Sequence, residues 1–306
     1  MNYEYYKIFY YVGKHKNITK ASAELYSSQP AVTRAIQKLE SELGCRLFMR
    51  NKNGVEFTYE GKVLHEYISI AHSYISKGEE EVKHAIDVET GTIYIGASVT
   101  SLHEFLFEFI NMFKAKHPKV KLKINTGSNN STVERLRDGI IDIAFVSTPC
   151  NNTKNLRLTT VHTFRDILIA GNNYSYLKNT VLQLKDISDY PIVSLRHSMQ
   201  LRQFLDEVFI NNNLTFSPEI EADGADLIVP MISNNLGLGF VPQSMAKSAI
   251  ARNRVFEVPL DYTMPTRQIN MIVDPRHPQT RASIEFVDMV NQYLKQQNGN
   301  TDNQPY

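Results

Sequence analysis

Two short helical patterns separated by a tight break, within residues 17–50, constrain the fold of this 306-residue chain more than any other feature. The first pattern begins near Thr19, which can cap a helix. The break is "YSSQP", in which Ser28 can cap the following helix and Pro30 suits its first turn. A preceding helix is predicted over residues 3–14, because apolar residues recur there three and four apart. Three helices joined in this way form a helix-turn-helix unit.

The second helix of the pair, predicted to end at Gly44, has an apolar side and an unusual polar side. Its buried stripe is predicted to consist of Ala31, Val32, Ala35, Ile36, Leu39 and Leu43. The other side carries short polar residues and an arginine, where an ordinary solvated helix would more often carry Glu/Lys pairs. Gln suits adenine, Arg suits guanine, and Thr can contact a thymine methyl group or a phosphate. The sequence therefore predicts a DNA-recognition helix, with a plain surface helix as the alternative.

The residues predicted to contact DNA lie mainly at the start of this helix, which is the part of a recognition helix that reaches base edges. A basic hairpin follows, with strands predicted over residues 47–49 and 55–58 and a turn at Asn53-Gly54. Its tip would lie against the DNA backbone as a wing. The first sixty residues hold nine Lys/Arg and six acids, a net charge of +3 that is compatible with this role. The predicted DNA-binding residues are Thr19, Ser28, Gln29, Pro30, Thr33, Arg34, Gln37, Lys38, Arg50 and Lys52.

This region resembles the winged helix-turn-helix of LysR-type transcriptional regulators. The family pattern is matched in register by "YYKIFYYV", "ITKASAEL", "SSQPAVTRAIQKLESELGCRLFMR" and "FTYEGKVL", with mild departures at Thr19 and Ala21-Ser22. The resemblance implies a sequence-specific regulator of transcription that binds double-stranded promoter DNA, with RNA polymerase as a further partner. The implied fold class is α/β, with an N-terminal winged helix-turn-helix, a long linker helix and a two-lobed effector domain like the periplasmic binding proteins.

A long helical pattern runs from Thr58 to about Val88. About thirty residues at 1.5 Å each span about 45 Å, which is too long to be buried against a small head. Pairing with a second copy is the economical solution, and packing on the chain's own body is the alternative. The resemblance implies a dimerisation helix with two heads on two half-sites, in a homo-oligomer that we expect to be a tetramer.

Strands and helices alternate through the rest of the chain, which predicts two α/β lobes with crossings near 161–164 and 266–268. The segments "GTIYIGAS", "VERLRDGIIDIAF", "FRDILIAG" and "NNLGLGFVP" resemble the family's effector-binding domain. The predicted domains are the winged helix-turn-helix (1–58), the linker helix (59–88), the effector-binding domain (89–295, with lobe I about 89–161 and 268–295 and lobe II about 162–267) and a disordered tail (296–306) that has little to bury.

A small-molecule effector is expected between the lobes, where strands end and helices begin. Hydroxyl and amide groups in such a cleft suit a small anion, often a carboxylate. For each Ser or Thr the alternative is a helix cap, and for His197 it is an ordinary surface position. The predicted effector-binding residues are Ser98, Thr100, Ser101, Ser128, Asn129, Ser147, Thr148, His197 and Ser198. Effector binding would shift the population between two arrangements of the heads on the promoter, and activation is the family's commoner output.

Other classes of function find little support in the sequence. No apolar run reaches the roughly 18 residues of a membrane span, and the N-terminus lacks the pattern of a signal peptide, so we expect a cytoplasmic protein. Cys45 and Cys150 lack metal-binding spacing; two buried thiols are expected, with a redox pair as the alternative, and no metal or cofactor. The nucleophile, metalloprotease and nucleotide-binding motifs of common enzymes are missing. The alternative to a regulator is a cytoplasmic small-molecule-binding protein or an enzyme with the same body.

Overall fold

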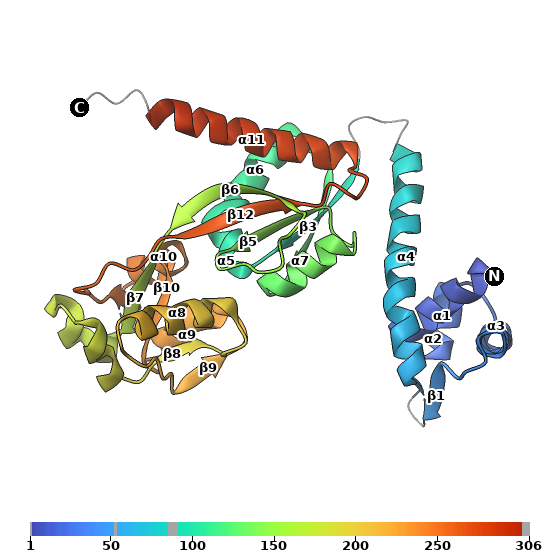
Figure 1. Cartoon of the computed structure of the whole chain (residues 1–306), viewed down its shortest axis with the longest axis horizontal. Helices are drawn as coiled ribbons and strands as arrows, with labels where there is room; N and C mark the ends of the chain where they lie inside the picture. Colours follow the sequence, from blue (N-terminus) through green and yellow to red (C-terminus); the bar gives the residue numbers. More distant parts are fainter. Residues whose placement is uncertain (1, 52–53, 85–90, 302–306) are drawn as a thin grey trace. The chain divides into compact units, whose positions relative to one another are not determined.

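A computed structural model describes residues 2–51, 54–84 and 91–301, in two units, Met1–Ile86 and Asp87–Tyr306 (Figure 1). The N-terminal unit has a three-helix head, a hairpin and one long helix. Its elements are α1 (Tyr3–His15), α2 (Ile18–Glu24), α3 (Gln29–Leu43), β1 (Phe48–Asn51), β2 (Gly54–Phe57) and α4 (Tyr59–His84). The linker helix predicted over 59–88 is thus seen as far as His84, and the last four residues of that prediction lie outside the described residues.

Short polar side chains cap the head helices. Asn17 Oδ1 accepts a hydrogen bond from Lys20 N at 3.0 Å, and Ser28 Oγ accepts one from Ala31 N at 3.4 Å. The cap of α2 is therefore Asn17 and not Thr19, which lies inside the first turn. Each cap satisfies an amide that has no acceptor within its own helix. The predicted cap at Ser28 and the predicted end of α3 at Gly44, which adopts φ 70°, are confirmed.

The core of the head forms where α1, α2 and α3 meet the hairpin. On α3 the buried residues are Val32, Ala35, Ile36 and Leu39. Leu43 was predicted to join them, but it is 41% exposed, because the last turn of α3 extends past the core. The apolar spacing thus orients α3 with its polar side toward solvent.

The hairpin pairs Phe48 with Phe57 and Asn51 with Gly54. Of the predicted turn Asn53-Gly54, Asn53 lies outside the described residues, and Gly54 is paired within β2 instead of lying in the turn. Gly54 belongs to β2 with φ 144°, and a Cβ there would meet the Lys16 carbonyl oxygen at 2.3 Å. The amide of Val55 donates to that same oxygen at 3.0 Å, which fixes the hairpin to the α1–α2 turn.

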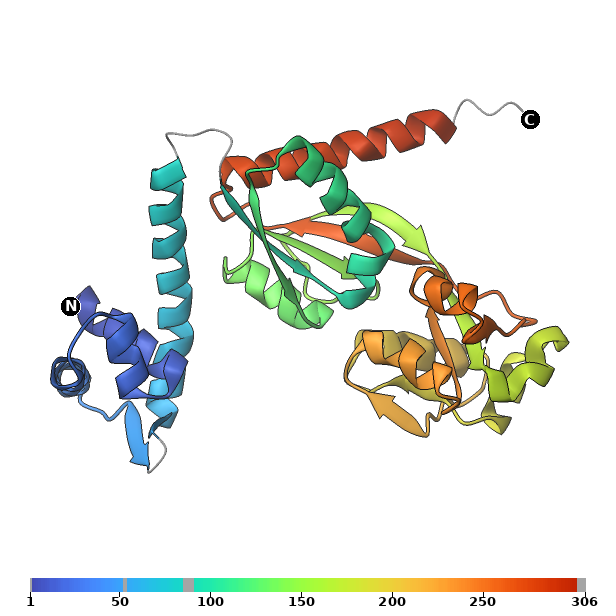
Figure 2. The same ribbon diagram turned by 180° about the vertical axis from the view of Figure 1, so that it is seen from behind.

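The C-terminal unit consists of two lobes, seen from the two sides in Figures 1 and 2. Lobe I contains β3 (Thr92–Ala97), α5 (Val99–Ser101), a π-helical turn η1 (Leu102–Leu106), α6 (Phe107–Lys116), β4 (Lys121–Thr126), α7 (Asn129–Arg137), β5 (Ile143–Ser147), β6 (Arg157–Phe164), β12 (Arg267–Val273) and α11 (Arg281–Thr301). Lobe II contains β7 (Asp166–Gly171), η2 (Asn172–Asn179), η3 (Leu184–Asp189), β8 (Val193–Leu195), α8 (Gln200–Asn211), β9 (Ile220–Ala222), η4 (Ala225–Leu227), α9 (Ile228–Ser233), β10 (Leu238–Pro242), α10 (Gln243–Ala251) and β11 (Val255–Glu257).

The lobe I sheet has the strand order β4-β3-β5-β12-β6, in which β12 runs antiparallel to both of its neighbours. Alternate residues of β5 face opposite sides. Ile143 and Phe145 pack with the helices α6 and α11, while Ala144 and Val146 pack with α7. Lobe II has a three-stranded sheet, β10-β7-β11, and a parallel pair, β8-β9.

Two boundaries differ from the prediction. The β6–β12 ladder continues to the pair Phe164–Arg267, so 162–164 and Arg267 belong to lobe I rather than lobe II. The tail predicted to be disordered from residue 296 is helical as far as Thr301. Extending an existing helix costs little because each added residue gains a hydrogen bond, and Gln297 Nε2 also donates to Tyr293 Oη at 2.8 Å. No helix among the described residues is long and apolar enough to cross a membrane.

Candidate nucleic-acid interface and ligand cleft

The outer side of α3 carries the predicted DNA-contacting side chains. Gln29, Pro30, Arg34, Gln37 and Lys38 are exposed, Thr33 is half-buried, and Thr19 is exposed on α2. Gln29, Pro30, Thr33 and Arg34 together line a shallow depression at the start of the helix. Because their backbone is held by the buried stripe and the Ser28 cap, this part of α3 presents amide and guanidinium groups from a fixed surface.

Arg34 is partly preoriented. Its Nε donates to the carbonyl oxygen of Pro30, one turn earlier, at 3.3 Å. The guanidinium keeps its remaining N–H groups available, and two of them in parallel match the acceptors of a guanine edge.

The wing prediction extends beyond what the structure describes. Arg50 lies in β1 opposite Val55, but its side chain and all of Lys52 are outside the described part of the chain. Contact of these two residues with DNA stays a prediction.

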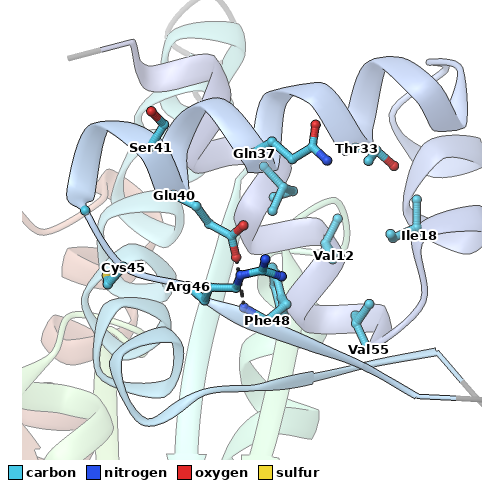
Figure 3. Close-up of a pocket in the computed structure, with 12 residues that line it drawn as sticks. Val12, Ile18, Thr33, Gln37, Glu40, Ser41, Cys45, Arg46, Phe48 and Val55 are labelled. Atoms are coloured by element: carbon cyan, nitrogen blue, oxygen red, sulfur yellow. Dashed lines mark hydrogen bonds between the residues drawn. The ribbon is translucent and has the colours of Figure 1, made fainter.

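A groove of about 640 Å³ lies between α3 and the hairpin (Figure 3). We call it the α3–hairpin groove. Thr33, Gln37 and Ser41, each one turn apart, form its α3 side, and Arg46 and Phe48 lie opposite. The groove is lined by Val12, Ile18, Thr33, Ile36, Gln37, Glu40, Ser41, Gly44, Cys45, Arg46, Phe48 and Val55. Ser41 and Arg46 line this groove but were not among the residues predicted to contact DNA.

In the C-terminal unit, a cavity of about 350 Å³ lies between the lobes. Five of the predicted effector residues line it: Ser98, Thr100, Ser128, Asn129 and Ser147. The other four do not line it: Ser101, Thr148, His197 and Ser198. His197 is 76% exposed at its side chain and its Nδ1 lies 3.0 Å from Asp206 Oδ2, as the surface alternative predicts.

Several of the cleft hydroxyls serve the fold. Ser98 Oγ accepts from Ser101 N at 3.1 Å and lies 2.7 Å from Ser101 Oγ. Ser128 Oγ accepts from Ser131 N at 3.2 Å. Both are helix caps, so the groups at these helix starts that remain for a ligand are mainly the first backbone amides.

Two further predicted residues have structural hydrogen bonds. Asn129 Nδ2 donates to the carbonyl oxygens of Ser147 at 2.5 Å and Pro149 at 3.0 Å. Thr148 Oγ1 accepts from Gln268 N at 2.8 Å, which orients it toward the β5–β12 ladder. These bonds fix the edge of the cleft in lobe I.

The cleft also contains residues that the sequence did not suggest. Arg267 lines it with a buried guanidinium, and Thr126 lies at the end of β4. Gln200 Nε2 donates to Asn130 Oδ1 at 2.7 Å and so joins α8 of lobe II to α7 of lobe I. Asp226 adds a carboxylate from lobe II. For Arg267 the sequence held one signal: it is a charged residue at the start of the apolar strand "RQINMIV". A charge that is buried there needs a partner.

Among the described residues, no group of three His, Cys, Asp or Glu side chains could hold a metal ion. Cys45 and Cys150 are free and half-buried, whereas two buried thiols were expected. Burial raises the pKa of the Cys150 thiol to about 11, which disfavours the reactive thiolate.

Comparison with known proteins identifies both parts of the chain. Residues 4–62 match the bacterial regulatory helix-turn-helix protein, lysR family, and residues 87–295 match the LysR substrate binding domain. The regulator AlsR of Bacillus subtilis is 26% identical over 249 residues, 81% of this chain and 82% of AlsR. A probable RuBisCO transcriptional regulator of Thalassiosira pseudonana is 24% identical over 283 residues, 90% and 92% of the two chains.

Solved structures agree on the fold. The crystal structure of CbnR, a LysR family transcriptional regulator, has a TM-score of 0.75 at 19% identity, covering 95% of this chain and 99% of CbnR. Full-length CbnR complexed with its target DNA gives 0.77 at 18% identity with the same coverage. The predicted fold class, with its head, linker helix and two-lobed domain, is confirmed.

Proposed function

Because this chain belongs to the LysR family of transcriptional regulators, whose members are not enzymes, we propose that α3 binds double-stranded promoter DNA sequence-specifically. The observation that carries this proposal is the polar side of α3, where Gln29, Arg34 and Gln37 are exposed on a rigid helix. The CbnR complex with its target DNA supports it by analogy of fold. A regulator that acts on chromosomal DNA is expected in the cytoplasm, where RNA polymerase is its further partner.

Footprinting on the DNA upstream of this gene and its neighbour tests the proposal. Purified full-length protein is used at a fixed salt concentration, because DNA affinity depends steeply on salt. Protection of a dyad site is expected, and Arg34→Ala should weaken specific binding by about 1–3 kcal/mol, the scale of one good base contact. Lys7→Ala on α1, where the lysine is half-buried and its Nζ lies 4.0 Å from Glu4 Oε2, is the control that removes an equal charge. Unchanged specific affinity in Arg34→Ala would contradict the role of α3.

The cleft between the lobes is the proposed site for a small-molecule effector that modulates promoter binding or activation. Ser98 and Ser128 mark two helix N-termini at this cleft, and helix N-termini favour anions. These groups support a small carboxylate or another small anion. On the opposite wall Asp226 supplies an acceptor, so a hydrogen-bond donor elsewhere on the ligand would complement it.

Self-association through α4 is the third part of the proposal. Five large apolar residues of this helix are exposed, at successive intervals of four, four, eight and seven residues. They are Tyr59, Val63, Tyr67, Ile75 and Val82. Exposed apolar residues in a continuous stripe favour pairing with a second helix. A dimer formed in this way, and a tetramer built from two dimers, would place several heads on one promoter.

A further inference from the structure

Arg46 is an exposed cation that lines the α3–hairpin groove. Among the residues that the structure describes, its guanidinium makes no hydrogen bond and no ion pair. Glu40 is the acidic residue of the same groove, but its Oε1 accepts from the amides of Leu47 at 2.7 Å and Phe48 at 3.2 Å. Figure 3 shows this carboxylate turned toward the backbone beside Arg46.

The backbone around Arg46 is nevertheless held firmly. The Glu40 bonds fix the two residues after it. The Arg46 carbonyl oxygen accepts from Thr58 Oγ1 at 2.7 Å, and the amide of Thr58 donates to Leu47 O at 3.0 Å. Thr58 Oγ1 in turn accepts from Gly61 N at 2.9 Å, which joins this segment to the start of α4. An arginine with a fixed backbone and free N–H groups is preorganised for a partner from outside the chain.

The groove is continuous with the proposed DNA-recognition surface. Thr33 lines both the groove and the depression at the start of α3, and Gln37 and Ser41 continue the same line of neutral polar side chains along the helix. Hydroxyl, amide and guanidinium donors are the groups that bind phosphate oxygens of DNA. Glu40 supplies the carboxylate among the lining residues, and its Oε1 is already engaged by two backbone amides.

We propose that the α3–hairpin groove binds a backbone phosphate of DNA, with Arg46 as the charged contact and Gln37 and Ser41 as neutral donors. The inference rests on the proposed function of α3. It adds a sequence-independent contact to the base contacts of Arg34, and it positions α3 in the major groove rather than selecting the bases.

Salt-dependent binding of the full-length protein tests this. We would measure DNA affinity on two labelled duplexes, one carrying the footprinted site and one of arbitrary sequence. The proteins compared are wild type, Arg46→Ala, Arg46→Lys, Arg34→Ala and Lys7→Ala. One phosphate contact contributes about 0.9 to the slope of log affinity against log salt. The advantage of wild type over Arg46→Ala should therefore shrink about 3.5-fold between about 50 and about 200 mM salt. Arg46→Ala should weaken both duplexes equally, whereas Arg34→Ala should weaken mainly the specific one.

The outcomes separate the two proposals. A wild-type slope in Arg46→Ala, or an equal loss of slope in Lys7→Ala, overturns the phosphate site while leaving the function of α3 intact. Failure of wild type to bind either duplex overturns the function of α3 and the phosphate site together. Recovery of the slope in Arg46→Lys supports a charge contact. Circular dichroism checks the fold, and Arg46→Gln replaces Arg46→Ala if the alanine variant unfolds.

Discussion

The Arg267 guanidinium lies 2.9 Å from the Asp166 carboxylate at the crossing between the two lobes, with side chains only 2% and 0% exposed. Each is the first residue of its strand, Arg267 of β12 and Asp166 of β7. Arg267 also donates to Thr148 O at 2.8 Å and Ser147 Oγ at 3.2 Å. Burial raises the pKa of Asp166, and the charge of Arg267 opposes that rise. One guanidinium thus ties together both lobes and a wall of the cleft.

We expect Asp166→Asn to destabilise the C-terminal unit strongly. The change leaves a buried guanidinium without its counter-charge, which typically costs about 3–5 kcal/mol. Chemical denaturation of the full-length protein, followed by circular dichroism, measures the loss. The matched control is Asp261→Asn, because Asp261 is exposed and its change should stay within about 0.5 kcal/mol of wild type. Equal denaturation midpoints for both variants would show that the pair contributes little.

The head could be predicted almost completely because its determinants are local. The spacing of Val32, Ala35, Ile36 and Leu39 and the cap at Ser28 are enough to define α3 and its outer side. The errors are also local: Asn17 competes with Thr19 as a cap, and Leu43 lies past the core. Local patterns of this kind are what single-sequence reasoning detects best.

The cleft could be predicted only in part. Ser98 and Ser128 were expected there because strand ends and helix starts meet at such a site, and the structure places them there as caps. For Arg267 the sequence offers only a charge at the start of an apolar strand, because its partner Asp166 is 101 positions away and only the chain topology brings them together. Gln200 reaches the cleft through a contact between lobes, which no local pattern encodes.

Filling the cleft should abolish ligand binding. Thr126 is an exposed residue at the end of β4 that lines the cleft of about 350 Å³, so Thr126→Phe adds volume there without disturbing a cap. A small carboxylate that binds in the cleft, at about 100 times its Kd, should raise the free energy of unfolding of wild type by about 2.7 kcal/mol. In thermal unfolding, the same carboxylate should raise the midpoint of wild type and leave that of Thr126→Phe unchanged. DNA binding should persist in the variant. Lys121→Phe, at the other end of β4, is the control, and a normal ligand response in Thr126→Phe would show that the ligand binds elsewhere.

Acid should destabilise the N-terminal unit through two histidines of α4. The rings of His72 and His65 lie 4.3 Å and 5.8 Å from that of Tyr10 on α1, measured between centroids. Burial lowers the pKa of both, and Lys7 adds to the effect at His72. In the unfolded chain a histidine has a pKa of about 6.5, so below that pH the unfolded chain binds more protons than the folded one. The contribution of these histidines to the free energy of unfolding is therefore constant above that pH and is lost as the pH falls below it.

Thermal unfolding of the full-length protein as a function of pH measures this loss. His65→Gln removes one titrating ring, so its unfolding temperature should fall less between pH 7 and pH 5 than that of wild type. His103→Gln, at an exposed position in the C-terminal unit, should keep the wild-type pH dependence. The same acid sensitivity in His65→Gln as in wild type would exclude His65 as a cause.

A charge on the exposed stripe of α4 should separate the subunits while leaving each head folded. Tyr67 is 71% exposed, so Tyr67→Glu removes little packing within one chain but would place a carboxylate in the apolar seam of a dimer. Sedimentation should show a smaller species for Tyr67→Glu than for wild type at equal concentration. Glu66→Gln, one position away on an exposed site outside the stripe, should keep the wild-type mass. If Tyr67→Glu sediments as wild type does, α4 does not join the subunits. If Tyr67→Glu dissociates, protection of the dyad site should also weaken, because two linked heads bind two half-sites more tightly than one head binds one half-site.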